Sequence, residues 1–571
     1  MLLGFATSCN FSDTKENKES VTQKNNLYVG SELAVQHGME LFNQHCASCH
    51  NFRENEIGPN LSGVTSEVPK DWLKTFIKDP KSVIENGDPR ASALFEKYKL
   101  YMPPFSNFND EELEDLLGFV RKFSEAEKKN KSTRKDGILD PIVDKIPTGD
   151  LSLVLEEWLT LPPSSQASPL ARINTMRGIK TRTGERLFLA DLRGKLYEIT
   201  NGNIKVYLDL NLEEDNFMDN PGFGTGLGSF AFHPDFETNG RFYTTHTEPP
   251  KTATADFAVP DSIRTTLQWV LTEWQVDDTA AIKFNGLKRE VLRADMVTGV
   301  HGFQELTFNT TAEKGTDDYG LLYLGIGDGG TALSGYPELC DNPRKIWGSV
   351  LRIDPTGNNS KNGKYGIPKD NPFVDQPDKL GEIWCRGFRN PHRISWNHDR
   401  PDQMFISNIG QHSVEEVNLG EKGADFGWPD REGTFLFDPN ANTELVYPLP
   451  KDDAGYSYPI IQYDHDEGNA VSGGFVYTNT TIPLLKGKYI FGDIPRGTLF
   501  YAETGNMIEG AQATVSKLGV TMNGQMSDME AITQNQRVDL RFGLDGSGNL
   551  YIFTKSNGKV YKVVDCISTS L

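Results

Sequence analysis

The sequence predicts a multidomain chain in which a small all-α domain is followed by a larger all-β domain of propeller type. Its 571 residues exceed what one ordinary hydrophobic core holds, so two or more domains are expected. Near the N-terminus, apolar residues recur at helical intervals over about one hundred residues. After about Pro162 the chain changes to short β-rich runs separated by Gly, Asp and Asn.

Composition narrows the class of protein. The hydrophobic fraction is 37%, the aromatic fraction is 10%, and Gly and Pro number 54 and 31, which is typical of a soluble, turn-rich globular protein. The formal net charge of −21 repels phosphate backbones, so we expect no nucleic-acid partner. Solubility is the simplest role for that charge.

Residues 1–26 have the character of a leader and a tether. The apolar run from Met1 to Ser8 ends in small residues before Cys9 and resembles the end of a bacterial lipoprotein signal, with Cys9 as the lipidated residue. A leader with an incidental cysteine is the alternative. The stretch Asn10–Asn26 is rich in Lys, Glu, Ser and Asn, as in a flexible tether. We therefore expect an exported protein, in the periplasm or at the cell surface, with a lipid anchor at Cys9.

The all-α domain is expected over residues 27–126. Apolar residues at helix-like intervals run from Glu32 to Cys46, and Asp71–Lys78 is a second candidate helix. A third helix is predicted to follow Asn109, which is a good N-cap and precedes an acidic first turn. The charged run that follows is typical of a solvated linker, which we place at residues 127–164.

The run Cys46-Ala-Ser-Cys49-His50 is a CxxCH motif, the attachment signature of a c-type haem. Two thioethers from the cysteines would hold the porphyrin, and His50 would bind the iron. A chain of this composition contains roughly 0.001 such motifs by chance. The alternatives are a redox CxxC pair or half of a zinc site, but no second CxxC exists in the sequence.

A second axial ligand for the iron is expected at Met102, in the run Tyr101-Met-Pro-Pro-Phe105 before the last helix. Methionine is a neutral ligand that raises the haem potential and suits electron acceptance. The motif and the loop Ile57-Gly-Pro-Asn-Leu61 together resemble class I cytochromes c over about residues 28–126. His45, beside the motif, is expected at the surface.

The second domain shows a degenerate repeat. Units containing Gly-x-Leu-Tyr recur, each with the pattern strand, tight turn, strand; examples are Arg186–Ile199, Gly320–Asp328 and Gly548–Val563. Repeated four-stranded blades would give a β-propeller, and a large sandwich array is the structural alternative.

Several motifs resemble the glucose/sorbosone dehydrogenase family, which includes soluble PQQ-dependent glucose dehydrogenase and aldose sugar dehydrogenases. They occur in family order at Gly226–Tyr243, Gly348–Asp354, Gly387–Pro391, Gly410–Asn418 and Phe426–Pro429. The resemblance implies a six-bladed propeller, which we place at residues 165–566.

The resemblance also implies a catalytic site. His301 matches the catalytic base, since a near-neutral imidazole can take a proton from a sugar hydroxyl; a structural histidine is the alternative. Arg389 and Asn390 match residues that hold the PQQ quinone, and a guanidinium there would stabilise developing negative charge. Gly410 and Gln411 fall where backbone carbonyls bind the catalytic Ca²⁺.

Other positions are less regular. Glu416 falls at a family position for a second, structural Ca²⁺, with a surface carboxylate as the alternative. After His301 the family has small residues, whereas this chain has Phe303 and Gln304. In the family, one Lys and two Arg pair with the PQQ carboxylates. At the corresponding positions this chain has Pro495, Gln536 and Val538 instead. Arg496 and Arg537 are the nearest replacement cations, and Arg541 is a third candidate.

The leading functional prediction is an exported oxidoreductase that oxidises a sugar or other alcohol with PQQ and Ca²⁺ and passes electrons through haem c to a downstream acceptor. The alternatives are a non-catalytic carbohydrate- or protein-binding propeller with an electron-transfer module, and an electron-transfer lipoprotein of the cell surface. Cys340, Cys385 and Cys566 could supply one disulfide in an exported protein, which leaves at least one thiol unpaired or paired elsewhere.

Overall fold

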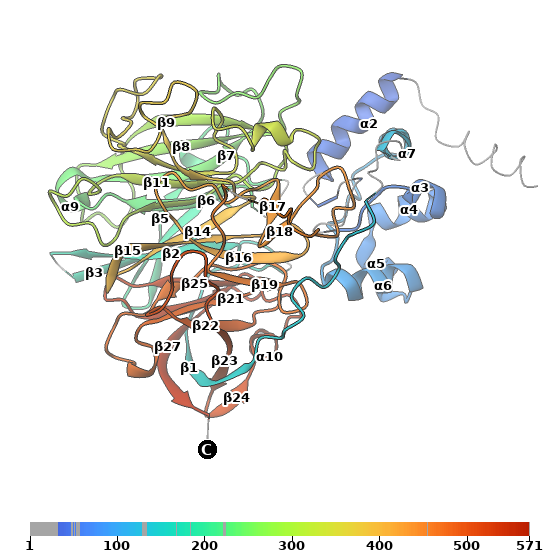
Figure 1. The fold of residues 1–571 in the computed structure, drawn as a ribbon. Coiled ribbons are helices and arrows are strands. Elements are labelled where there is room, and N and C mark those ends of the chain that lie inside the picture. The colour runs from blue at the N-terminus through green and yellow to red at the C-terminus, as the bar shows by residue number, and fades with distance from the viewer. Residues whose placement is uncertain are drawn as a thin grey trace, which may run out of the picture. The chain divides into compact units, whose positions relative to one another are not determined.

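The computed structural model resolves the chain into two compact units, Met1–Asn130 and Lys131–Leu571, which are described separately (Figure 1). Cys9 and the tether lie outside the described residues. The residues described here are 32–46, 49–50, 52, 58–127, 134–166, 168–182, 184–220, 224–453 and 455–569.

The first unit is helical where it is described. Its helices are α2 Glu32–His45, α3 Val64–Glu67, α4 Lys70–Lys78, α5 Pro80–Glu85, α6 Pro89–Tyr98 and α7 Asp110–Glu127. The three helices expected from the sequence correspond to α2, α4 and α7. Asn109 is confirmed as the cap of α7, because its Oδ1 accepts the Glu112 N–H at 3.0 Å and Glu112 Oε2 accepts the Asn109 N–H at 2.8 Å.

Helices α2 and α7 cross at a glycine. A Cβ on Gly38 would lie 1.9 Å from the Asp115 carbonyl oxygen, so only glycine lets the two backbones approach this closely. The crossing covers an apolar core made of Leu41, Phe42, Phe52, Phe108, Leu113, Leu116, Phe119 and Val120.

Gly38→Ala should therefore lower the stability of the helical unit. The helix propensity of alanine gains about 1 kcal/mol, but separating two packed helices costs more, so a net loss on the order of 2 kcal/mol is expected. Thermal unfolding followed at the haem bands measures it. The control is Gly505→Ala, where the added methyl meets nothing within 4 Å; equal stability of the two variants would contradict the close-crossing argument.

The second unit is mostly β. Three of its sheets have four strands each: β6 Leu227–Phe232, β7 Arg241–Glu248, β8 Leu267–Val276 and β9 Gly286–Met296; β10 Phe303–Phe308, β11 Leu322–Ile326, β12 Ser349–Ile353 and β13 Ile383–Arg386; and β14 Pro391–Asn397, β15 Arg400–Asn408, β16 Val414–Leu419 and β19 Ile461–Asp464. Strands β17 Arg431–Glu432 and β18 Phe435–Leu436 form a separate pair.

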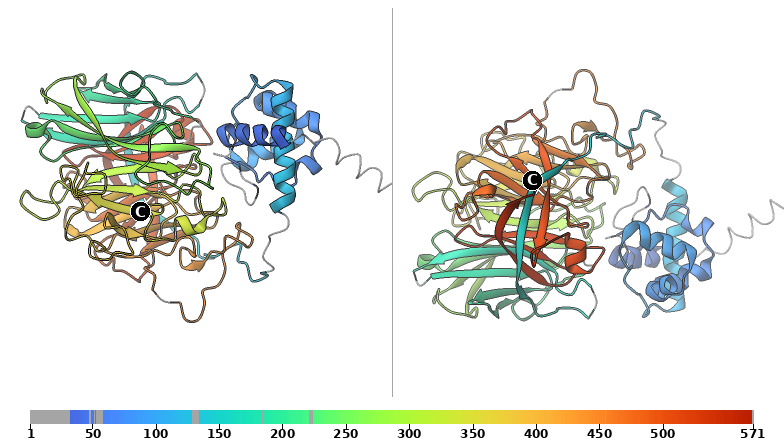
Figure 2. Two further views of the ribbon diagram at one scale, coloured as in Figure 1. Left: turned by 90° about the horizontal axis from the view of Figure 1, so that it is seen from above. Right: turned by 90° about the horizontal axis from the view of Figure 1, so that it is seen from below.

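A fourth sheet joins the two ends of this unit. Its path runs β20-β21-β22-β23-β1-β27-β26-β25-β2-β3-β4-β5, with β24 paired to β23. The strands are β1 Thr148–Thr160, β2 Ile173–Thr181, β3 Gly184–Asp191, β4 Lys195–Thr200, β5 Asn203–Asp209, β20 Phe475–Val476, β21 Lys488–Gly492, β22 Leu499–Glu503, β23 Val515–Met522, β24 Gln525–Ser527, β25 Leu540–Leu544, β26 Leu550–Thr554 and β27 Lys559–Ser568. In both views of Figure 2 the strands from β2 to β5 lie beside the red strands that precede the C-terminus, and β2 pairs with β25.

Short helices connect some of these strands: α8 Leu210–Glu213, α9 Phe236–Asn239, α10 Met529–Thr533, and the 3₁₀ turns η2 Pro337–Leu339 and η3 Pro483–Leu485. Mostly antiparallel four-stranded groups with short connections are consistent with a β-propeller. Among the described helices of the chain, none is both long and apolar enough to cross a membrane.

Strand β1 lies inside the range expected to be linker, 127–164. It pairs antiparallel with β27 and parallel with β23. The cause is the alternation of Leu151, Leu153 and Leu155, whose side chains are buried in one hydrophobic cluster. The connection before β1, residues 134–147, follows the surface of the second unit and is described further below.

The cysteines of the second unit are all free thiols. Cys340, Cys385 and Cys566 are buried in three different hydrophobic clusters, so no two of them are placed to form a disulfide. Burial raises the pKa of Cys566 to about 11, which keeps its thiol protonated at neutral pH.

Candidate functional site

The CxxCH residues are placed at the end of α2. The Cys49 and His50 amides both donate to the Cys46 carbonyl at 3.0 Å, which folds the motif into a tight turn after the helix. Neither Cys46 nor Cys49 takes part in a disulfide among the described residues, as thioether attachment requires. Cys46, Cys49 and His50 therefore lie directly after the end of α2.

The orientation of His50 is fixed by its neighbours. Its Nδ1 lies 2.9 Å from the Pro59 carbonyl oxygen, so Nδ1 carries the proton and Nε2 is left as the metal-binding nitrogen. A Cβ on Gly58 would lie 2.4 Å from the imidazole Cε1, so a glycine is needed beside the ring. These residues fit a haem iron at Nε2.

Met102 lies in the loop between α6 and α7 and is half-buried. The Phe105 amide, which donates to the Ile77 carbonyl at 3.0 Å, holds this loop against α4. His45 was expected at the surface; it is half-buried, with its ring 5.7 Å from the ring of Phe105 and 5.2 Å from that of Phe108. Its packing against aromatic rings explains the difference.

His301 forms a hydrogen-bonded pair with Asp328. The imidazole Nδ1 lies 2.7 Å from Asp328 Oδ1. Asp328 also accepts the Gly330 N–H at 2.8 Å and the Trp428 Nε1–H at 3.1 Å, so three donors hold one buried carboxylate. His301 has a left-handed backbone with φ 52°, a conformation that costs a non-glycine residue roughly 1–3 kcal/mol.

The surroundings of His301 and Asp328 shift the pKa values of both side chains. Burial lowers the pKa of His301, and the charge of Arg389 lowers it further, against the opposing effect of Asp328. Burial raises the pKa of Asp328, but the hydrogen bond from His301 and the charges of His301 and Arg389 bring it below its usual value. Asp328 is therefore ionised, His301 is neutral with its proton on Nδ1, and Nε2 can accept a proton.

Buried polar atoms without partners surround Arg389. The Arg389 Nε–H donates to Gln411 Oε1 at 2.6 Å, and the Arg389 carbonyl accepts the Asp328 amide at 2.7 Å, which links this arginine to the His301 pair. Asn390 Oδ1 and Gln411 Nε2 are buried and have no hydrogen-bond partner among the described residues. Unpaired buried polar atoms are costly unless a ligand satisfies them.

The loop that carries Gly410 and Gln411 is wrapped around a carboxylate. Glu432 Oε1 accepts four successive backbone amides, those of residues 411–414, at 2.8 to 3.0 Å. The amides of this loop therefore face Glu432, which fixes the loop's conformation. A hard cation at the carbonyls of Gly410 and Gln411 is compatible with this arrangement.

Glu416 is buried, not a surface carboxylate. It accepts hydrogen bonds from Asn408 and Asn418 at 3.1 Å each and from the Gly433 amide at 2.5 Å. Burial raises the pKa of Glu416 to about 7, although these hydrogen bonds oppose the rise.

The replacement cations are engaged within the protein. Arg496 donates to the carbonyls of His465 and Asp466 at 2.8 and 2.7 Å. Arg537 pairs with Asp539 at 2.9 Å. Arg541 is buried and donates to the Leu540 carbonyl at 2.7 Å.

Phe303 and Gln304, which depart from the family pattern, have structural roles. Phe303 is fully buried and stacks on Trp269 with ring centroids 6.0 Å apart. The Gln304 Nε2–H donates to the Gly224 carbonyl at 3.3 Å.

Sequence reasoning missed Asp328, Trp428 and Glu432. In the sequence, Asp328 stands out only as the last residue of the Gly320–Asp328 repeat, and Trp428 only as part of the Phe426–Pro429 motif. A carboxylate directly after a buried strand, preceded by glycine, was the available signal for Asp328. Glu432 carried no comparable signal.

The fold and this site together define a class: a mostly β protein with a buried histidine–carboxylate pair and an N-terminal helical domain that carries a CxxCH motif. A family model described as glucose / sorbosone dehydrogenase matches residues 176–562, and one described as cytochrome c matches residues 35–124. The chain therefore belongs to the glucose/sorbosone dehydrogenase family and carries an N-terminal cytochrome c domain, which implies a haem c.

Similar proteins cover part of the chain. The HIPL1 protein of Arabidopsis thaliana is 26% identical over 392 residues, 59% of this chain and 53% of that protein. Hedgehog-interacting protein of Homo sapiens is 24% identical over 408 residues, which cover 67% of this chain and 49% of that protein. Aldose sugar dehydrogenase YliI of Escherichia coli is 25% identical over 252 residues, which cover 43% of this chain and 57% of that protein. The matched part thus spans about half the length of these curated relatives.

A crystal structure of a glucose dehydrogenase has a TM-score of 0.50 to this chain at 18% identity, and covers 72% of this chain and 99% of that one. At this identity the likeness supports the fold alone.

Proposed function

We propose that the chain oxidises a hydroxyl group of an aldose or other alcohol at the His301 site and delivers the electrons to its own haem c. The observation that carries the proposal is the His301–Asp328 pair, with Nδ1 and Oδ1 2.7 Å apart and the charge of Arg389 acting on the imidazole. An oriented, neutral imidazole can remove a proton from a hydroxyl group, and a guanidinium next to it can stabilise the negative charge that develops.

Each residue has a distinct part in this reaction. His301 takes the hydroxyl proton on Nε2, and Asp328 stabilises the imidazolium that forms. Arg389 stabilises negative charge that develops opposite the base. The left-handed backbone of His301 fixes the direction of the ring, since the strain is retained only where the surroundings enforce it.

The cofactor proposed for this site is PQQ with Ca²⁺. PQQ, when bound, accepts the hydride equivalent from the substrate carbon. Asn390 Oδ1 and Gln411 Nε2 lack partners among the described residues and would hydrogen-bond a polar cofactor next to Arg389, whose Nε–H donates to Gln411 Oε1. The carbonyls of Gly410 and Gln411 would hold the catalytic Ca²⁺, and Glu416 a second Ca²⁺. Arg496 and Arg537 would exchange their internal partners for the cofactor's carboxylates.

We also propose that the strands of the second unit form six blades. In support, β2, β6, β10, β14 and β20 contact one another in succession, β21 contacts β25, and β25 pairs with β2. Six groups of four strands result when β1 is counted with β25, β26 and β27. The outermost strand of the last blade would then come from the start of the unit.

The haem is proposed as the electron outlet. The haem, when bound, takes up single electrons. Met102 would be the second protein ligand that holds the haem iron, which would keep substrate from binding there and would leave the substrate chemistry to His301. A covalent connection between the two units raises the effective concentration of the acceptor. Export to the periplasm or cell surface, with a lipid anchor at Cys9, belongs to the same proposal and rests on the leader sequence alone.

One titration tests the oxidation. The haem-matured, metal-depleted chain is given PQQ, Ca²⁺ and a panel of aldoses, and haem reduction is followed at its visible bands. Reduction is expected only when all three are present. If calorimetry finds no PQQ binding and no aldose reduces the haem, the proposal is wrong.

The second candidate is a non-catalytic carbohydrate- or protein-binding propeller with an electron-transfer cytochrome. The hydrogen bonds of Arg496 favour this candidate. Arg496 is the cation nearest the family's lysine position, and its donation to the His465 and Asp466 carbonyls competes with pairing to a PQQ carboxylate. The human relative, Hedgehog-interacting protein, is by its name a protein that interacts with another protein. Saturable glycan binding without PQQ binding would select this candidate.

A further inference from the structure

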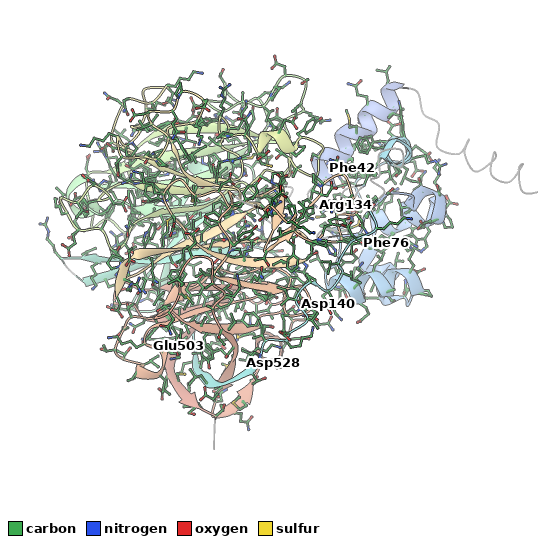
Figure 3. The ribbon with its side chains drawn as sticks, viewed as in Figure 1. Phe42, Phe76, Arg134, Asp140, Glu503 and Asp528 are labelled. Carbon is green, nitrogen blue, oxygen red and sulfur yellow. The ribbon has the colours of Figure 1, made fainter. Side chains whose placement is uncertain are left out.

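Three aspartates from two distant parts of the second unit come together on its surface. One oxygen atom each from Asp140, Asp464 and Asp466 lies within 4.8 Å of the others. Asp140 belongs to the connection before β1, whereas Asp464 ends β19. Figure 3 labels Asp140 on this connection. All three residues belong to the unit Lys131–Leu571, so the cluster lies within one compact body.

The central carboxylate is buried and half-satisfied. Asp464 is only 3% exposed. Its Oδ2 accepts the Ile142 N–H at 3.2 Å, while its Oδ1 is buried and has no hydrogen-bond donor among the described residues. A buried carboxylate oxygen without a partner is destabilising, so a missing ligand is indicated at Oδ1.

The charges of the cluster do not balance. Lys145 forms an ion pair with Asp466, and no cation of the described residues forms an ion pair with Asp140 or Asp464. A divalent cation would supply the two missing positive charges.

A cavity adjoins the cluster. Its volume is about 280 Å³, and its lining residues are Leu139, Asp140, His412, Ser413, Asp464, His465 and Asp466. Because one water occupies about 30 Å³ in the liquid, this space holds a cation together with several coordinating waters. The cluster is therefore open to solvent ions on one side and closed by Asp464 on the other.

We propose that Asp140, Asp464 and Asp466 bind a Ca²⁺ ion. This ion would link the connection before β1, residues 134–147, to the loop after β19. Carboxylates at irregular spacing with room for water suit Ca²⁺, which takes six to eight oxygen ligands in flexible geometry. Zinc would prefer nitrogen ligands, but His465 Nε2 is occupied by Glu415 Oε1 at 2.9 Å. The ligands here are side-chain carboxylates, whereas the catalytic Ca²⁺ proposed above would be held by the backbone carbonyls of Gly410 and Gln411.

The bound Ca²⁺ would reinforce hydrogen bonds that already hold residues 134–147 to the rest of the second unit. The Ile138 amide donates to the Val446 carbonyl at 2.8 Å, the Ile146 amide to Glu467 Oε1 at 3.0 Å, and the Lys517 amide to the Pro147 carbonyl at 2.8 Å. Asp140 lies between the first two of these contacts. Calcium would thus determine how firmly the segment that follows the cytochrome domain is held on the propeller unit.

The test uses the full-length, haem-loaded chain, stripped with a chelator and studied without PQQ or substrate. Asp140→Asn should bind one Ca²⁺ fewer than the parent in calorimetry. The control, Asp144→Asn, removes an exposed carboxylate of the same connection outside the cluster and should bind as the parent does. Ca²⁺ should slow tryptic cleavage within 134–147 at least five-fold in the parent and the control, and have no such effect in Asp140→Asn.

Asp466→Asn is the second cluster variant and should reproduce the loss, since it leaves the buried Asp464 untouched. Unchanged Ca²⁺ stoichiometry and protection in both cluster variants would overturn the proposal. Protection by Zn²⁺ but not Ca²⁺ would overturn the choice of metal. Because no readout depends on PQQ or catalysis, failure here is distinct from failure of the proposed oxidation.

Discussion

Replacing His301 with alanine is expected to reduce aldose-driven haem reduction by a factor of about 10² to 10⁴, the usual contribution of a positioned general base. The haem itself is not altered, so reduction by dithionite should proceed as in the parent. Stopped-flow spectroscopy at the haem bands measures both rates. The matched control is His398→Ala, because His398 is an exposed histidine of the same unit whose Nε2 lies 3.1 Å from the Thr310 hydroxyl.

Asp328→Asn and the pH profile separate a catalytic His301 from a structural one. The amide would favour the wrong imidazole tautomer, so the substrate-driven rate should fall while PQQ affinity is retained. Catalysis needs the neutral imidazole, so the rate should fall as the pH drops through the pKa of His301, which lies below its ordinary value of 6.5. A rate that is insensitive to Asp328→Asn, or an acid limb above pH 6.5, would rule out His301 as the base.

Removing both thiols, Cys46→Ser with Cys49→Ser, is expected to abolish covalent haem and with it all electron output. Without thioethers, haem is held only by weaker contacts and is lost on denaturation. Mass spectrometry of the intact chain and the haem absorbance of denatured protein measure the loss. Covalent haem in the double variant would contradict the assignment of the motif.

Met102→Ala gives the contrasting result. Haem should remain attached, but its spectrum and reduction potential should change, because the neutral sulfur ligand that raises the potential is gone. The control is Met526→Ala, which removes an exposed methionine of the second unit. If neither the spectrum nor the potential differs from the control, Met102 is not an axial ligand.

The sequence predicted local features well and long-range pairings poorly. CxxCH is five consecutive residues, and the capping of α7 by Asn109 depends on residues three apart, so neither needs knowledge of the fold. The β repeats were visible for the same reason, because each hairpin is local. The prediction of a helical CxxCH domain followed by a β domain thus followed from short-range chemistry.

The parts that were missed depend on residues that are distant in sequence. Asp328 is 27 residues from His301, and Glu432 meets a loop that begins 21 residues earlier. Strand β1 has only a short alternating apolar run, and its partner β27 is about 400 residues away. One sequence contains no direct signal for such pairings, because loop closure brings together residues whose types are individually common.

The pairing of β1 with β27 and β23 has a consequence for the order of folding. During synthesis the cytochrome domain and β1 emerge early, whereas the strands that β1 needs are made last. The helical unit can therefore take up its haem while the β unit is still incomplete, and β1 presents unpaired edges until the final strand arrives. Shortening the C-terminus by the length of β27 would leave those edges permanently exposed, so aggregation, rather than local loss of one strand, is the expected fate of such a chain.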